Sequence, residues 1–147
     1  MAILRSRYSY KNMGLLLLRL GIGFMFILHG WPKMAGGPER WEVLGKNMAL
    51  FGADFLPLFW GFMAAFAETV GGFLLMLGLF FRPVCVLLLI TMLVATTRHV
   101  TAGDGFGGYS HALEAAILFF SLLFIGPGKY SLDKVIFPEK KNRRIYS

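Results

Sequence analysis

The side chains that could do chemistry in this chain sit inside long apolar segments. The first such segment carries Arg19, His29 and Lys33 within RLGIGFMFILHGWPK, and Glu68 is the only ionisable residue of the second. A charge in the middle of a membrane helix costs about 3 kcal/mol or more. Such residues must pair, change protonation or face water, so they indicate either a structural ion pair or a functional site.

All three histidines fall near one membrane surface when the apolar segments are threaded up and down through a bilayer. At 1.5 Å per residue, Glu68 lies about 15 Å below that surface. If these faces converge, they line a polar pocket that opens outward, with Glu68 at its floor. Glu68 and His29 are the predicted catalytic proton carriers, because carboxylates and histidines, which titrate near neutral pH, can move protons. The predicted cofactor-binding residues are Arg19, Lys33, Arg98, His99, His111 and Glu114.

Two kinds of ligand suit such a pocket. Histidine, lysine and arginine side chains can donate hydrogen bonds to the carbonyl groups of a quinone that enters from the lipid. Three histidines and a carboxylate could also ligate a transition metal, but their spacing matches no recognised metal motif. We therefore predict a quinone and expect no metal site. For any single residue a plainer reading competes, in which the histidines are interfacial and Lys33 and Arg98 snorkel to the surface.

The same depth estimate predicts an ion pair between Arg19 and Glu68. Arg19 lies about 8 Å above the inner boundary of a hydrocarbon core that is about 30 Å thick. The remaining vertical gap to Glu68 is about 7 Å, which two long side chains can bridge. This pair could be a purely structural staple, and for Arg19 the structural and functional readings stay open.

The elements that must position these residues are membrane helices. The chain has 147 residues, 56% of them hydrophobic and 16% charged, and its mean hydropathy is +0.63, whereas soluble domains carry about 25% charged residues. The segments lack the polar face of a soluble bundle and the alternation of a membrane barrel. We predict an all-α fold, a four-transmembrane-helix bundle in a single domain over residues 1–147. The expected helices are 13–31, 58–81, 83–100 and 110–126, followed by a basic cytoplasmic tail over 127–147.

Two further features concern packing. A stripe of Trp41, Leu44, Met48 and Phe51 predicts a short amphipathic interfacial helix between the first and second membrane helices. Small residues recur along the second helix and at two positions of the first, and they would let the helix backbones approach closely in lipid and would permit a homo-oligomer. These small residues are Gly23, Gly30, Gly61, Ala64, Ala65, Gly71 and Gly72.

The basic residues predict the orientation and one partner. Of the lysines and arginines outside the apolar segments, ten lie with the two termini and the turn at Arg82, and four lie on the other side. By the positive-inside rule both termini are cytoplasmic. The basic tail next to the membrane is expected to contact anionic lipid rather than nucleic acid.

Three stretches of the chain resemble the DoxX family of small bacterial membrane proteins. They are LLLLRLGIGFMFILHGWPKM, AETVGGFLLMLGLFFRP and GPGKYSLD, and the resemblance covers residues from about Leu15 to Asp133. It implies four membrane helices in the bacterial inner membrane and an oxidoreductase function, since relatives include quinone-reducing membrane subunits. The residues of this sequence that match the family's motifs are Arg19, His29, Gly30, Lys33, Glu68, Gly72 and Arg82. The chain departs from relatives with paired cysteines, because Cys85 is its only cysteine, which rules out disulfide chemistry within one chain.

Two classes of function follow. The first is a quinone-linked oxidoreductase or its membrane subunit, which would receive electrons from a protein donor on the outer side. The second is a non-catalytic membrane partner, such as a scaffold, an assembly factor or a small-molecule carrier. The sequence shows no flavin, haem, nucleotide or iron–sulfur motif, so a redox role requires a partner or a diffusing quinone.

The distribution of basic residues gives a testable topology. A reporter that is active only in the cytoplasm should be active when fused after Ser147, because the basic excess on the terminal side holds that side in the cytoplasm. A reporter that is active only in the periplasm should be inactive at the same position. The opposite result would invert the chain and with it the outward direction of the predicted pocket.

Overall fold

The structure, a computed structural model, describes residues 10–138 and contains only helices in that range. Nine helical elements follow one another in these residues. In chain order they are α1 (Lys11–Ala35), α2 (Gly37–Gly45), the 3-10 helix η2 (Lys46–Phe51), α3 (Pro57–Phe66), the π-helix η3 (Ala67–Gly71), α4 (Gly72–Leu77), α5 (Phe81–Thr101), α6 (Gly105–Ile125) and α7 (Leu132–Ile136).

Four of the helices among the described residues are long and apolar enough to cross a membrane, which confirms the predicted all-α bundle. They are Lys11–Ala35, Pro57–Leu77, Phe81–Thr101 and Gly105–Ile125, and the second consists of α3, η3 and α4 in one continuous rod. Large apolar side chains on the outside of the bundle, such as Ile90, Ile117 and Phe124, are about half exposed or more. Such a surface suits lipid.

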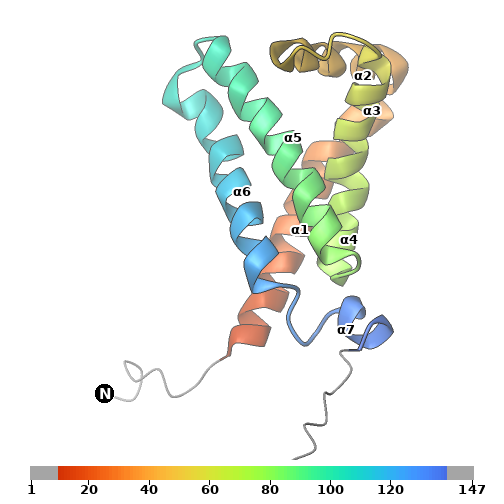
Figure 1. Ribbon diagram of the computed structural model, residues 1–147, viewed down its shortest axis with the longest axis vertical. Helices are drawn as coiled ribbons and strands as arrows, with labels where there is room; N and C mark the ends of the chain where they lie inside the picture. The colour runs from red at the N-terminus through yellow and green to blue at the C-terminus, as the bar shows by residue number, and fades with distance from the viewer. Residues whose placement is uncertain (1–9, 139–147) are drawn as a thin grey trace, which may run out of the picture.

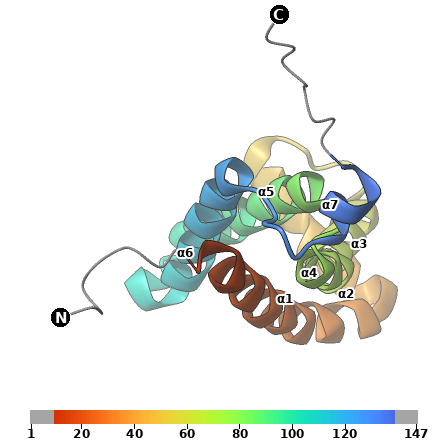
Figure 2. The same cartoon turned by 90° about the horizontal axis from the view of Figure 1, so that it is seen from below.

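The long helices form two pairs. Helix α5 packs most extensively on α6, while α1 packs on η3 and α4. Figure 1 shows the α5–α6 pair beside the pair that α1 makes with the second rod, with α2 and η2 at one end and α7 at the other. The view from the α7 end in Figure 2 shows the four long helices around a common interior. There Phe26 of α1 meets Phe119 of α6 edge to face, with the ring centroids 5.0 Å apart.

The segment between the first two spans is helical, as predicted, but it divides into two elements and one side of it is buried against α3. The rings of Trp41 and Phe62 pack edge to face, with their centroids 5.0 Å apart. A Cβ on Gly61 would lie 1.6 Å from the Trp41 carbonyl oxygen, so the two backbones touch. Part of the apolar stripe therefore faces protein, while Phe51 at its end remains half exposed.

The turn between the second and third spans lies elsewhere than predicted. The second span ends at Leu77 rather than residue 81, because Gly78 adopts a left-handed conformation with φ 64°. Helix α5 then begins at Phe81, where the carboxylate of Asp133 accepts hydrogen bonds from the backbone N–H groups of Phe80 (2.8 Å) and Phe81 (2.9 Å). A residue 52 positions away in the chain thus caps this helix.

The other ends of the spans also differ from the prediction. Helix α1 runs from 11 to 35 rather than from 13 to 31, and it continues through Pro32. Helix α6 begins at Gly105, five residues before the predicted start. Helix α7 follows Ser131, whose hydroxyl donates to the Gly128 carbonyl at 2.8 Å and does not cap the helix.

Glycine contacts set the register between α1 and the second rod, as the small-residue pattern predicted. A Cβ on Gly23 would lie 2.5 Å from the carbonyl oxygen of Gly72, and a Cβ on Gly30 would lie 2.5 Å from the backbone nitrogen of Thr69. Neither distance leaves room for a side chain. The two helices therefore touch through their backbones.

Replacing Gly30 by Ala should destabilise the protein, since the added methyl group would force α1 away from Thr69. Overpacking of this kind costs about 1–3 kcal/mol. The matched control is Gly21→Ala on the same helix, where no heavy atom lies within 4 Å of the added Cβ. Thermal unfolding in detergent should show a lower midpoint for Gly30→Ala only. Equal midpoints for the two variants would contradict the close contact.

Candidate functional site

The most conspicuous polar feature of the bundle is an ion pair between Lys33 and Glu68. The Lys33 ammonium donates to both carboxylate oxygens of Glu68, at 2.6 and 2.5 Å. Only 3% of the Glu68 side chain is exposed, against 29% of the Lys33 side chain. The carboxylate is therefore enclosed by protein, while the ammonium reaches it from a partly open side.

The pair lies in the wall of a cavity of about 700 Å³ at the α2 end of the bundle. We call it the Lys33–Glu68 cavity. Its walls come from the end of α1, from α2 and η2, from the second rod and from the last part of α5. The residues that line it are Lys33, Gly36, Glu39, Arg40, Val43, Leu44, Asn47, Ala64, Glu68, Thr91, Val94, Ala95, Arg98 and His99.

Local structure explains how Glu68 reaches this position. It lies in the π-helical turn η3, between α3 and α4. A π-turn inserts one extra residue into a helix and often accompanies functional sites. The neighbouring Thr69 lies against Gly30 of α1, which places Glu68 at the level of the last turns of α1.

Lys33 is held from the other side. The indole N–H of Trp41 donates to the backbone carbonyl of Lys33 at 2.9 Å, and this bond ties α2 to the end of α1. The Lys33 side chain can then extend along the bundle to Glu68. Because an isolated charge in apolar surroundings costs about 3 kcal/mol or more, each member of the pair depends on the other.

A second polar group on α5 faces the same cavity. His99 Nδ1 lies 2.6 Å from Asp104 Oδ2, so a ring N–H donates to this carboxylate. The guanidinium of Arg98 lies 3.5 Å from His99 Nε2. Asp104 thus fixes the imidazole ring and leaves its other nitrogen on the Arg98 side. The cavity therefore combines cationic and hydrogen-bonding groups with apolar walls.

The structure brings together four of the eight sequence-predicted site residues. Lys33, Glu68, Arg98 and His99 line the Lys33–Glu68 cavity. The other four do not line it. His29 is exposed on α1, His111 and Glu114 are exposed on α6, and Arg19 lies at the opposite end of the bundle.

The predicted ion pair between Arg19 and Glu68 is wrong. The contact of Gly30 with Thr69 fixes Glu68 beside the end of α1, about 16 Å along the helix from Arg19. Lys33 is one turn from Gly30 and takes the carboxylate instead. The depth estimate failed because it placed each helix separately from its ends, whereas backbone contact decides which residues are level.

Arg19 instead fastens the segment before α7. Its side chain is fully buried, its Nη2 donates to the Tyr130 carbonyl, and its guanidinium packs on Gly78. The backbone N–H of Asp133 donates to the Gly78 carbonyl at 3.0 Å. Arg19 therefore has a structural role here, which is one of the two readings that the sequence left open.

Sequence reasoning missed Asp104 and Trp41. Asp104 follows His99 by five residues in the turn after α5, and an acidic residue just past a helix end with a histidine in its last turn was the available signal. Trp41 was read only as part of an apolar stripe, although a tryptophan N–H seeks an acceptor when it is buried. In the described residues no three histidine, cysteine or carboxylate side chains gather as a metal site would need, and the absence of metal stays a prediction.

Comparison with known proteins identifies the chain's relatives. It is 29% identical over 134 residues to a Bacillus subtilis protein named "Putative oxidoreductase CatD", with 91% of this chain and 95% of that one covered. It is 31% identical over 128 residues to the "Inner membrane protein YphA" of Escherichia coli, with 82% and 88% covered. It is 33% identical over 135 residues to an uncharacterised protein of Haemophilus influenzae, with 88% and 95% covered. No solved structure matches the chain.

The sequence model of one family, DoxX, matches residues 14–102. This range contains Lys33, Glu68, Arg98 and His99, so all four site residues gathered in the cavity lie inside the family region. The four apolar helices and the relative named as an Escherichia coli inner membrane protein together indicate a multi-pass inner-membrane protein. The chain belongs to the DoxX family.

Proposed function

We propose that this protein is a quinone-linked oxidoreductase, or the membrane subunit of one, and that the Lys33–Glu68 cavity binds the quinone head group. The observation that carries the proposal is the buried Lys33–Glu68 pair in the wall of a cavity lined by α5 as well. Ionisable residues inside a membrane span mark a functional site by default. One relative carries the name "Putative oxidoreductase CatD", which points to the same class of reaction.

The cavity fits a quinone by size and by chemistry. Its volume of about 700 Å³ falls in the range of small-molecule sites, about 300–1,000 Å³. A quinone head group is flat and apolar with two carbonyl oxygens, and Val43, Leu44 and Val94 offer apolar walls. Arg98 offers hydrogen-bond donors on the α5 side, where Asp104 holds the neighbouring His99 ring in place.

The Lys33–Glu68 pair is the proposed proton-transfer group. A lysine ammonium has three N–H donors, and the two that point at Glu68 leave a third that can point into the cavity. Quinone reduction requires two electrons and two protons. Lys33 gives one proton from Nζ to the reduced quinone, and a proton from solvent on the partly open side then restores the ammonium beside the Glu68 carboxylate. The same cycle delivers the second proton, so the pair returns to its starting charge after each two-electron reduction.

The electrons must come from another molecule. Cys85 is the only cysteine of the chain and is buried in the core. We therefore assign the electrons to a donor protein that docks at the α2 end of the bundle. His29, predicted as a proton carrier from sequence, lies outside the cavity, and the proposal gives its role to Lys33.

Removing both charges of the Lys33–Glu68 pair should abolish quinone binding without lowering the unfolding midpoint. Losing one partner of a buried pair costs about 3–5 kcal/mol, whereas replacing both by apolar residues is often neutral. Lys33→Met alone should therefore lower the unfolding midpoint, and Lys33→Met with Glu68→Leu should restore it. The double variant should nevertheless lose quinone binding. Quenching of Trp41 fluorescence by a short-chain quinone, in a protein with Trp31→Phe and Trp60→Phe, measures that binding.

The matched control is the exposed pair of Glu42 and Lys46 at the same end, whose charged atoms lie 3.3 Å apart. Lys46→Met with Glu42→Leu should leave both stability and binding unchanged. Wild-type quinone affinity in the stable Lys33→Met, Glu68→Leu variant would contradict the proposal. The pair would then be a structural staple, and the chain a non-catalytic membrane partner.

A second variant tests the proton role directly. Glu68→Gln keeps the size of the side chain but cannot carry a proton. It also leaves Lys33 without its charge partner, so the unfolding midpoint should fall as for Lys33→Met while the protein remains membrane-inserted. Quinone reduction by membranes containing it should fall by about 100-fold or more, as expected for the loss of a proton-transfer group. Full activity in a well-expressed Glu68→Gln protein would leave the carboxylate without this role.

A further inference from the structure

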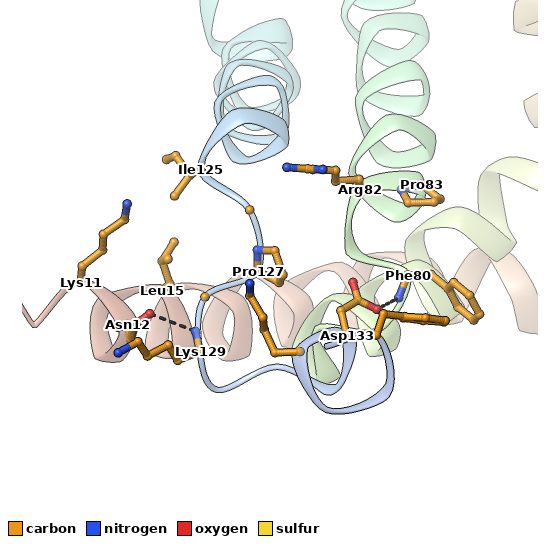
Figure 3. Close-up of a pocket in the computed structure, with 14 residues that line it drawn as sticks. Lys11, Asn12, Leu15, Phe80, Arg82, Pro83, Ile125, Pro127, Lys129 and Asp133 are labelled. Carbon is orange, nitrogen blue, oxygen red and sulfur yellow. Dashed lines mark hydrogen bonds between the residues drawn. The ribbon is translucent and has the colours of Figure 1, made fainter. Parts of the chain in front are cut away.

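The opposite end of the bundle contains a second cavity, separate from the proposed quinone site. Its volume is about 670 Å³, and it is enclosed by the start of α1, the start of α5 and the segment that runs from the end of α6 into α7. Figure 3 shows side chains from these three parts of the chain around one hollow. We call it the α7-end cavity. It lies at the end predicted to face the cytoplasm.

Charge is distributed unevenly in this cavity. Four cationic side chains line it, those of Lys11, Arg82, Lys129 and Lys134, and Asp133 is the one carboxylate among the lining residues. Both oxygens of Asp133 already accept backbone hydrogen bonds at the start of α5, one of which is drawn in Figure 3. The part of the chain that the structure describes gives Lys11, Arg82 and Lys129 no carboxylate partner.

The positive-inside rule alone explains basic residues at this end but not their arrangement around a hollow. The segment after α6 is fixed against α1, because the backbone N–H of Lys129 donates to Asn12 Oδ1 at 2.9 Å. A Cβ on Gly128 would meet the side chain of Leu15 at 3.2 Å, so the backbone itself is packed there. The backbone that carries Lys129 is therefore held in place by its own contacts with α1.

The cavity also has apolar surface at a defined depth. Leu15, Ile125 and Pro83 line it, and each lies at or near the end of a membrane span. Lys11 and Arg82 are the first and second residues of their helices. Cations at the ends of spans and apolar residues just inside them match the boundary between phosphate head groups and acyl chains.

From this arrangement we propose that the α7-end cavity binds the phosphate group of an anionic phospholipid, with the head group between the cations and the first part of the acyl chains on Leu15 and Ile125. A bare phosphate ion shares the anionic chemistry, but it would use neither the apolar surface nor most of the volume. The site is independent of the Lys33–Glu68 cavity and of quinone binding.

Native mass spectrometry of the detergent-solubilised full-length protein tests the proposal, with phosphatidylglycerol and phosphatidylcholine as probes. One phosphatidylglycerol should bind in clear preference to phosphatidylcholine. Because one Lys or Arg near an anionic surface contributes about a fivefold gain in affinity, Arg82→Gln with Lys129→Gln should weaken phosphatidylglycerol binding about tenfold or more. Both side chains are exposed, so the fold should survive, and Arg82→Lys with Lys129→Arg should bind like the wild type.

The matched control removes the same number of positive charges from the C-terminal tail. Lys140→Gln with Lys141→Gln, at positions outside the described residues, should leave the preference within about twofold, since diffuse attraction falls off by screening. An equal loss in both charge-removing variants, or no preference between the two lipids, would overturn the proposal. Displacement of the lipid by millimolar inorganic phosphate would overturn the lipid assignment and identify a free-phosphate site.

Discussion

The backbone contact between α1 and the second rod is the constraint on which the rest of the structure depends. Gly23, Gly30 and Gly72 leave no room for side chains where they meet, so the two helices have one register with respect to each other. In lipid there is no hydrophobic force to hold helices together, and close packing of this kind must do so. The register then decides which charged residues are level and can pair.

Given that register, the two deeply buried charges of the bundle meet different partners. Glu68 lies level with the end of α1 and is neutralised by Lys33, whose side chain lies on the partly open side. Arg19 lies at the other end and is bound by a backbone carbonyl of the segment before α7. An ion pair beside a cavity can exchange protons or admit a ligand. The Arg19 guanidinium is fully buried and donates to one backbone carbonyl, so it links α1 to the segment before α7.

Much of the fold could be predicted from sequence because membrane spans are determined by composition and length, which are local properties. The four helices, the helical link after the first span and the small-residue packing all follow from such patterns. The ion pair could not be predicted in the same way. Whether Glu68 pairs with Arg19 or with Lys33 depends on the level of Thr69 against Gly30, which is a contact between distant segments. The cap that Asp133 places on α5 is likewise non-local, and α5 begins at Phe81, two residues before the predicted start.

The two cavities share a physical origin. Each opens where the long helices end and a shorter segment closes over them, α2 and η2 at one end and the segment leading to α7 at the other. Their charges nevertheless differ in kind. The α2-end cavity contains the buried Lys33–Glu68 pair beside Arg40, Arg98 and Glu39. Four cations and one carboxylate are among the described residues that line the α7-end cavity, and that carboxylate is already bonded to backbone. The proposed quinone and the proposed anionic head group would therefore meet linings of different charge at opposite ends of the same bundle.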